Sequence, residues 1–234
     1  MKTKVSASTN KSGAEVNPDK PKRRKDGRLT KAERTKKSIL ESAQIVFAEE
    51  GYDRTTLDDI GDRVNLLGTA ILYHFKSKKH LYHETLRFSF KSISKKITAD
   101  IDQSLSLEEM VVKIGIDLIR ESVDRPESVK LFMREAAAGT PESLSIIGPM
   151  IGNALQYLIA ALENPKRSSK STVNFDPVLV TSMLLGVISF YFSGFPTIMG
   201  DKLPYDPLDP ERVRKLENSI EIFVRLLMNT NKES

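Results

Sequence analysis

Two short helical patterns separated by a tight turn are the feature that most restricts how this chain can fold. The first pattern follows Thr56, which suits an N-cap and is followed by two aspartates in the first turn. It stops at Asn65, a residue that tolerates positive φ. A second helix is expected from about residue 67 to Phe75, because Ser77 suits the N-cap of the next one. This arrangement predicts a helix-turn-helix.

Helical spacing of apolar residues continues on both sides of this motif. "TKAE", which begins at Thr30, has the form of a capping box for a helix over roughly 31–50, and Gly51 stands where a left-handed C-cap is wanted. A stripe from Tyr82 to Ile101 predicts one long helix. Later helices are expected at roughly 107–123, 127–138, 141–163, 177–195 and 210–229. No segment alternates as strands do, so we predict an all-α fold.

These helices divide into a small head and a larger body. Residues 1–28 contain too little apolar content to offset chain entropy, so we expect a disordered basic arm. Residues 29–78 make the predicted helix-turn-helix head, and residues 79–234 make a larger helical domain. The chain has no cysteine and no apolar run at its start, so a reducing compartment fits and neither signal peptide nor anchor is expected. We expect a cytoplasmic location.

Charge is distributed unevenly along the chain. Residues 1–37 hold 13 Lys and Arg against 4 Asp and Glu, whereas residues 101–234 hold 14 against 18. Lysine and arginine that neutralise phosphates release counterions, so a basic arm suits a polyanionic partner. The alternative is a solvated tail without a partner.

The stretch "TTLDDIGDRVNLLGTAILYHFKSKKHLY" resembles the DNA-binding head of the TetR family of bacterial transcriptional regulators. The resemblance runs from about Thr30 to Tyr82 and rests on Gly51–Tyr52, Thr55–Thr56, Ile60–Gly61, Tyr73–Phe75 and Ser77–Lys78. Two departures concern the base contacts rather than the fold. Asn65, Leu66 and Leu67 replace the usual Gly-Val-Ser, so the recognition helix lacks a Ser N-cap, and Leu72 stands where Tyr is common.

The resemblance implies that the second helix of the motif enters the major groove. Ile71 and Phe75 are expected to bury inward, while Tyr73 can bond a phosphate or base edge and Leu72 can touch a thymine methyl. His74 either contacts phosphate or packs beneath the helix. The expected DNA-binding residues are Arg34, Thr55, Thr56, Gly68, Thr69, Leu72, Tyr73, His74, Lys76 and Lys78. The alternative is a small aromatic core beside a solvated charge run.

The resemblance also implies a homodimer joined through the last two helices as a four-helix bundle. The expected interface residues are Ser182, Gly186, Ser189, Ser193, Leu216, Ile220, Phe223 and Leu227. Residues 177–200 contain no charge, so a membrane anchor is an alternative for that stretch. Its small residues, Pro196 and acidic flanks favour an interface helix instead.

An apolar effector cavity among the middle helices is a further implication of the resemblance. Its expected lining is Met110, Ile114, Phe132, Met133, Leu155 and Phe190, although each of these can instead be ordinary core. Arg134 and Glu135 lie in an apolar segment and are candidates for a polar contact or a buried pair.

No catalytic motif is present. His80, His83 and Glu84 lack a further ligand cluster, so a polar helix surface is favoured over a metal site, and no cofactor is expected. We therefore predict a ligand-responsive, DNA-binding transcriptional regulator that is not an enzyme, most simply a repressor released from a palindromic operator by a small, largely apolar effector. The alternatives are an effector-free DNA-organising protein and a helical small-molecule carrier.

Overall fold

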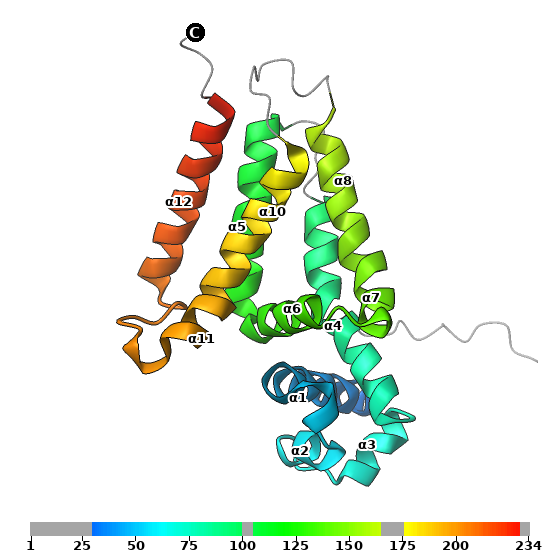
Figure 1. The fold of residues 1–234 in the computed structure, drawn as a ribbon. Helices are drawn as coiled ribbons and strands as arrows, with labels where there is room; N and C mark the ends of the chain where they lie inside the picture. The colour runs from blue at the N-terminus through cyan, green and yellow to red at the C-terminus, as the bar shows by residue number, and fades with distance from the viewer. Residues whose placement is uncertain (1–29, 100–104, 165–175, 230–234) are drawn as a thin grey trace, which may run out of the picture.

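The structure is a computed structural model that describes residues 30–99, 105–164 and 176–229. All regular secondary structure in these ranges is helical, which confirms the predicted fold class (Figure 1). The predicted arm at 1–28 and Ile101, the last residue of the predicted long stripe, lie outside the described residues.

Three helices make the head: α1 (Lys31–Arg54), α2 (Leu57–Asp62) and α3 (Gly68–His74). The predicted capping box starts α1, since Thr30 Oγ1 accepts from the Glu33 N–H at 3.2 Å and the Glu33 carboxylate accepts from the Thr30 N–H at 2.7 Å. Gly51 has φ 81°, as predicted, but one more helical turn follows it before α1 ends. The side chains that hold these helices together are fully buried, and they include Ile39, Phe47, Ile60, Ile71 and Phe75.

The long helix α4 (Lys78–Ala99) leaves the head and enters the body, as predicted (Figure 1). Ser77 caps it by accepting from the His80 N–H at 3.1 Å. Leu86 and Phe90 pack in the head cluster, and Ile97 packs in the body cluster. One continuous helix therefore belongs to both hydrophobic cores.

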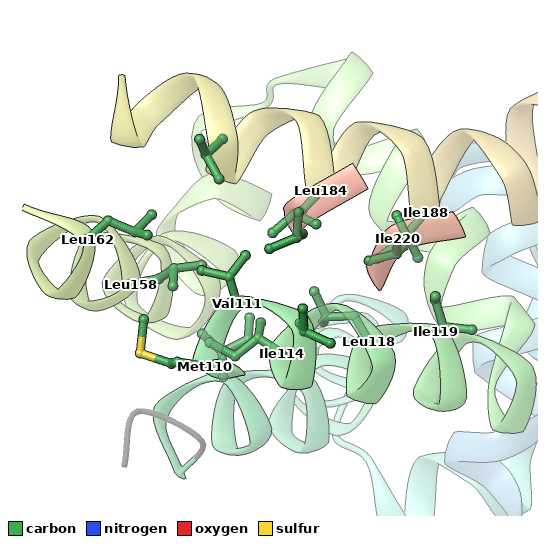
Figure 2. Close-up of a cluster of buried hydrophobic side chains, with 14 of the residues drawn as sticks. Met110, Val111, Ile114, Leu118, Ile119, Leu158, Leu162, Leu184, Ile188 and Ile220 are labelled. Atoms are coloured by element: carbon green, nitrogen blue, oxygen red, sulfur yellow. The ribbon is translucent and has the colours of Figure 1, made fainter. Parts of the chain in front are cut away.

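The body contains α5 (Leu107–Asp124) and the remaining helices. In chain order they are α6 (Pro126–Ala138), α7 (Pro141–Ile147), η1 (Gly148–Gly152), α8 (Asn153–Leu162), α10 (Pro177–Ser189), η2 (Phe190–Gly194), α11 (Phe195–Met199), η3 (Gly200–Lys202) and α12 (Pro210–Asn229). Figure 2 shows Met110, Ile114 and Leu118 of α5 facing side chains of α8, α10 and α12. These apolar contacts make α5 the centre of the body.

Two of the predicted helices contain π-helical turns that were not predicted from the sequence. The turn η1 interrupts the predicted helix at 141–163, and η2 interrupts the one at 177–195. Pro149 lies within η1 and Pro196 lies just beyond η2. Because proline has no N–H, neither residue can make the regular i→i−4 hydrogen bond, and the helix must rearrange locally.

Candidate nucleic-acid interface and effector cavity

The turn between α2 and α3 is built from close backbone contacts. Thr56 and Asp59 form a second capping box, and the hydrogen bonds from Thr56 lower the pKa of the Asp59 carboxyl. Asn65 has φ 54°, as predicted. A Cβ on Gly61 would lie 2.1 Å from the Leu66 carbonyl oxygen, so the turn requires glycine at position 61. These features fix how α3 is presented.

Asp58 of α2 satisfies one of the free N–H groups at the start of α3, where the serine N-cap of the family is missing. The Gly68 N–H donates to Asp58 Oδ1 at 3.0 Å, while the N-cap residue Leu67 makes no capping hydrogen bond with its side chain. A Cβ on Gly68 would lie 2.6 Å from the same oxygen. Gly68 is therefore needed for the close approach of α2 and α3, and the side chain of Leu67 is free to face outward.

The two faces of α3 differ as predicted. Ile71 and Phe75 are fully buried against the head core. Thr69 is exposed, Tyr73 is 89% exposed and Leu72 is 43% exposed. The exposed face is available to a partner that enters from outside the head.

Two expected DNA-facing residues are placed differently. Gly68 is buried between α2 and α3, so the expectation that it lies on the open face was wrong. Thr55 is 1% exposed and donates its hydroxyl to the Gly51 carbonyl oxygen at 2.7 Å. Both residues are buried in contacts within the head, so they support the exposed face of α3 and are not part of it.

The remaining polar residues expected at DNA lie around this face. Arg34, Thr56 and Lys76 are exposed, and His74 is half-buried with its ring 5.5 Å from the ring of Tyr73. Lys78 is also half-buried: its ammonium donates to the Asp53 carbonyl oxygen at 3.1 Å and lies 4.6 Å from the centre of the Tyr52 ring. Lys78 thus holds the start of α4 against the end of α1.

Arg134 and Glu135 join the body to the head. Arg134 donates to the carbonyl oxygens of Ala48 and Glu49, which lie just before the break at Gly51. Glu135 is buried and hydrogen-bonded to the hydroxyl of Tyr82, and burial together with this bond raises the pKa of Tyr82. The two residues therefore make polar contacts to α1 and α4.

A second polar bond supports the same junction. The amide of Gln44 on α1 donates to the hydroxyl of Ser128 on α6 at 2.5 Å, and both side chains are buried. At the start of α7, Glu142 accepts from Lys79 and pairs with His83, and Lys79 first and then His83 lower its pKa. The start of α4, which adjoins the head, is consequently bonded to α7, and α1 of the head is bonded to α6.

A small apolar cavity of about 40 Å³, partly open to solvent, lies among the helices of the body next to this junction. It is walled by Phe90 and Ile93 of α4, Leu118 and Ser122 of α5, Val129 and Phe132 of α6, Ile151 of η1, and Leu185, Ile188 and Ser189 of α10. Ile151 comes from one π-helical turn, and Ser189 immediately precedes the other. Such turns are frequent at functional sites, because they redirect side chains locally.

Only Phe132 of the six expected effector residues lines this cavity. Met110 and Ile114 are buried in the body core, nearer the N-terminus of α5 than the lining residues Leu118 and Ser122. Met133 is not among the lining side chains, and Leu155 packs against both hydrophobic clusters instead. Phe190 is 45% exposed and does not line this cavity.

An apolar surface remains exposed on α10 and α12. Ser182 and Gly186 are exposed on α10 as expected of an interface, and Leu179 and Val187 extend this surface. On α12 the exposed apolar side chains are those of Ile222 and Leu226.

The other expected interface residues are buried to different extents in the core of a single chain. Ser189, Ser193, Leu216 and Ile220 are buried within one chain, which contradicts their expected exposure to a partner. Phe223 and Leu227 are partly buried and pack against the same core. Within one chain, Leu216 and Ile220 of α12 thus face the core, whereas Ile222 and Leu226 face outward.

Two described stretches are long and apolar enough to cross a membrane, 141–162 and 177–202. In the second of these, Val180, Leu184 and Ile188 pack into the body core, and α10 contacts α5, α6 and α8. A helix with one face in a protein core and small residues on the other face is suited to a helix bundle. This placement favours the interface alternative over the membrane alternative.

Comparison with known proteins places the motif in a described family. The family model "Bacterial regulatory proteins, tetR family" matches residues 39–85. The chain is 29% identical over 110 residues to the biofilm operon icaADBC HTH-type negative transcriptional regulator IcaR of Staphylococcus aureus, a match that covers 47% of this chain and 57% of that protein. It is 26% identical over 189 residues to the HTH-type transcriptional regulator YhgD of Bacillus subtilis, covering 81% of this chain and 94% of that protein.

Solved structures share the fold over most of the chain. FadR from Bacillus subtilis, in complex with stearoyl-CoA, has a TM-score of 0.61 and 19% identity, covering 82% of this chain and 97% of that one. AibR, in complex with isovaleryl coenzyme A and operator DNA, has a TM-score of 0.64 and 16% identity, covering 82% and 97%. At this level of identity the likeness establishes the helical fold.

Proposed function

Because this chain belongs to the TetR family of bacterial regulatory proteins, whose members are DNA-binding regulators and not enzymes, we propose that it is a homodimeric, effector-controlled repressor. Residues 29–78 bind DNA, and residues 79–234 bind the effector and dimerise. The basic arm at 1–28 adds phosphate contacts that depend on salt concentration. Operation on DNA implies a cytoplasmic location.

The observation that carries this proposal is the position of the cavity between the helices that hold the head. Phe90 and Ile93 come from α4, which enters the head directly. Val129 and Phe132 come from α6, whose Ser128 and Arg134 bond to α1. A change in the volume of this cavity therefore acts on both supports of the head at once.

The small size of the cavity supports a coupling mechanism. About 40 Å³ accommodates only about three water molecules, so a larger ligand must push the walls apart. A ligand shifts an equilibrium only through its different affinity for the two states. The state with a widened cavity is then the one that the ligand favours, and its heads are displaced from the DNA-binding spacing.

The effector class we propose is a largely apolar molecule, with acyl thioesters of coenzyme A as the first candidates. The cavity wall is apolar apart from two serines, Ser122 and Ser189. Two similar folds are described with acyl-CoA molecules, stearoyl-CoA and isovaleryl coenzyme A. A short acyl chain fits the cavity with less displacement than a long one.

The dimer we propose uses the exposed face of α10 and α12, with Leu179, Gly186, Ile222 and Leu226 at its centre. A twofold dimer places two copies of α3 in successive major grooves, so the operator is a palindrome. The test is footprinting of the full-length protein on the promoter region of its own gene. The proposal expects one protected palindromic site, whereas a carrier leaves no footprint and a DNA-organising protein leaves many scattered ones.

A further inference from the structure

We propose that α3 reads its half-site chiefly through the C5-methyl groups of thymines, and that Leu67 is a specificity-determining residue alongside Leu72. The inference rests on the proposed function, because it names the base feature that the DNA-binding face recognises. Its starting point is an exposed leucine at each of two positions on the outer side of this short element.

Leu67 is presented by the end of α3 that approaches bases. The side chain of Leu67 is 75% exposed, although it belongs to an apolar residue at the N-cap. Single exposed leucines are ordinary on protein surfaces. In a helix-turn-helix, however, the N-terminal residues of the second helix are the ones that contact base edges in the major groove.

The capping arrangement explains why a leucine is tolerated at this position. An N-cap residue normally accepts a backbone N–H with its side chain. Here the side chain of Leu67 makes no capping hydrogen bond, and Asp58 of α2 satisfies the first N–H of α3 by accepting from Gly68 at 3.0 Å. The buried contact of Gly68 with α2 also fixes the direction in which the chain leaves Leu67.

The side chains that usually read purines are missing from this element. Residues 66–75 contain no Arg, Lys, Asn or Gln. Arg and Lys normally make the contacts to guanine, and Asn and Gln those to adenine, whereas apolar side chains contact the thymine methyl. Thr69 and Tyr73 offer hydroxyls, which can both donate and accept and therefore discriminate less sharply. Leucine methyl groups are left as the discriminating atoms.

The neighbouring lysines either lie at the far end of α3 from Leu67 or are engaged within the head. Lys76 follows α3 at its C-terminal end, opposite to Leu67, and is exposed. Lys36 lies 5.3 Å from the centre of the buried Phe75 ring, and Lys78 is bonded to the Asp53 carbonyl oxygen. Leu67 therefore lies at the end of α3 away from Lys76.

The experiment compares thymine with uracil, because deoxyuridine lacks only the C5-methyl group. The full-length protein first selects duplexes from a random-sequence library. An enriched duplex is then resynthesised with one thymine at a time replaced by deoxyuridine. A methyl group removed from an apolar contact weakens binding about fourfold. We expect that loss at one or more positions per half-site with the wild-type protein.

Substitutions then assign each methyl group to a leucine. Leu67→Ala should weaken binding to the thymine duplex about fourfold. In this variant, one of the uracil replacements should no longer weaken binding further. Leu72→Ala should abolish the effect of a different uracil replacement. Leu144→Ala is the matched control, because Leu144 is an exposed leucine on α7, away from α3. Since Leu67 is largely exposed, its variant should melt like the wild type.

Four outcomes would overturn the inference. Uracil tolerated at every position, or an unchanged uracil penalty in both leucine variants, would contradict methyl recognition while leaving the repressor proposal intact. Enriched sites that lack any required thymine would do the same. If the library yields no enriched sequence at all, the DNA-binding proposal itself fails together with the inference.

Discussion

Arg134 on α6 donates a hydrogen bond from Nη2 to the carbonyl oxygen of Glu49 on α1 at 2.8 Å. The last carbonyl groups of a helix have no partner within it, and here the guanidinium of another helix satisfies two of them near the Gly51 break. Two residues earlier, Phe132 of the same helix walls the cavity. A ligand that displaces Phe132 therefore acts on a helix that is bonded directly to the head.

Arg134→Ala should reduce the coupling between effector and operator. A hydrogen bond from a charged group is worth about 1.5–3 kcal/mol, so a hundredfold effect of the effector on operator affinity should fall to about tenfold or less. Operator affinity without effector should stay within about threefold. The measurement is fluorescence anisotropy of a labelled operator with and without saturating effector.

Arg120→Ala is the control for this change, because Arg120 is an exposed arginine on α5 that pairs with Glu217 of α12 instead of a helix of the head. Its coupling should equal that of the wild type. Equal coupling in the Arg134 variant as well would show that α6 does not transmit the effect through this bond.

Changing the cavity volume should alter the effector response. Ser122→Leu fills the cavity, and the Ser122 hydroxyl donates only to the Leu118 carbonyl oxygen within its own helix, so little polar contact is lost. Effector affinity should fall at least tenfold while operator affinity is kept. Phe132→Ala widens the cavity, costs about 3 kcal/mol of stability because Phe132 is partly buried, and should admit larger effectors. Calorimetric titration of effector into the free dimer measures both changes.

The control for the cavity variants is Met133→Ala, the next residue on α6, which is not among the side chains that line the cavity. Effector affinity unaffected by Ser122→Leu would place the effector elsewhere in the molecule.

Ile222→Glu should dissociate the dimer. Ile222 is 59% exposed in one chain, so the protomer tolerates a carboxylate there. In a dimer the same carboxylate is buried without a partner, which costs several kcal/mol and should raise the dimer dissociation constant at least about a hundredfold. Sedimentation velocity over a concentration series gives this constant.

Leu144→Glu places the same charge on an exposed leucine of α7 and should leave the dimer intact. A dimer that survives Ile222→Glu unchanged would mean that the chains associate through another surface.

The contacts of Glu142 predict a pH dependence of stability. Lys79 and then His83 hold the pKa of Glu142 below its ordinary value of 4.5. A carboxyl whose pKa is lowered by folding stabilises the protein above its unfolded pKa, and this contribution is lost as the pH falls through the lowered value. Wild-type Tm should therefore exceed that of Glu142→Gln at pH 7, and the difference should shrink below about pH 4.5.

Lys79→Met removes the principal cause of the shift and should flatten the same dependence. A difference in Tm between wild type and Glu142→Gln that stays constant from neutral to acid pH would refute the assignment.

Local signals explain why the head could be predicted closely from the sequence. The capping boxes at Thr30 and Thr56 and the positive φ at Asn65 depend on residues within a few positions of each other. The buried pair Ile71 and Phe75 follows from helical periodicity in the same way. The burial of Gly68 was not predicted, because it depends on a contact with Asp58, which lies ten residues away on another helix.

Tertiary packing decides the features of the body that periodicity leaves open. The helix α12 carries apolar residues on more than one face, and the pattern alone does not say that Ile220 faces α5 while Ile222 faces outward. From the sequence, Phe190 and Met110 were equally plausible as cavity-lining residues. The position of a residue along its helix does not reveal which other helix packs against that residue. The π-helical turn after Ser189 changes the phase of the helix and has no clear sequence signal beyond the nearby proline.

The most direct test of the account is the operator affinity of the full-length dimer with and without a ligand that demonstrably binds it. Acyl-CoA thioesters of increasing chain length are first screened for a rise in the Tm of the free dimer, and operator dissociation constants are then measured at saturation. Burial of about 100–150 Å² more apolar ligand surface in one state supplies about 2.7 kcal/mol, so the account predicts about a hundredfold weaker operator binding. A compound that raises the Tm of the dimer yet leaves operator affinity unchanged at saturation would contradict it.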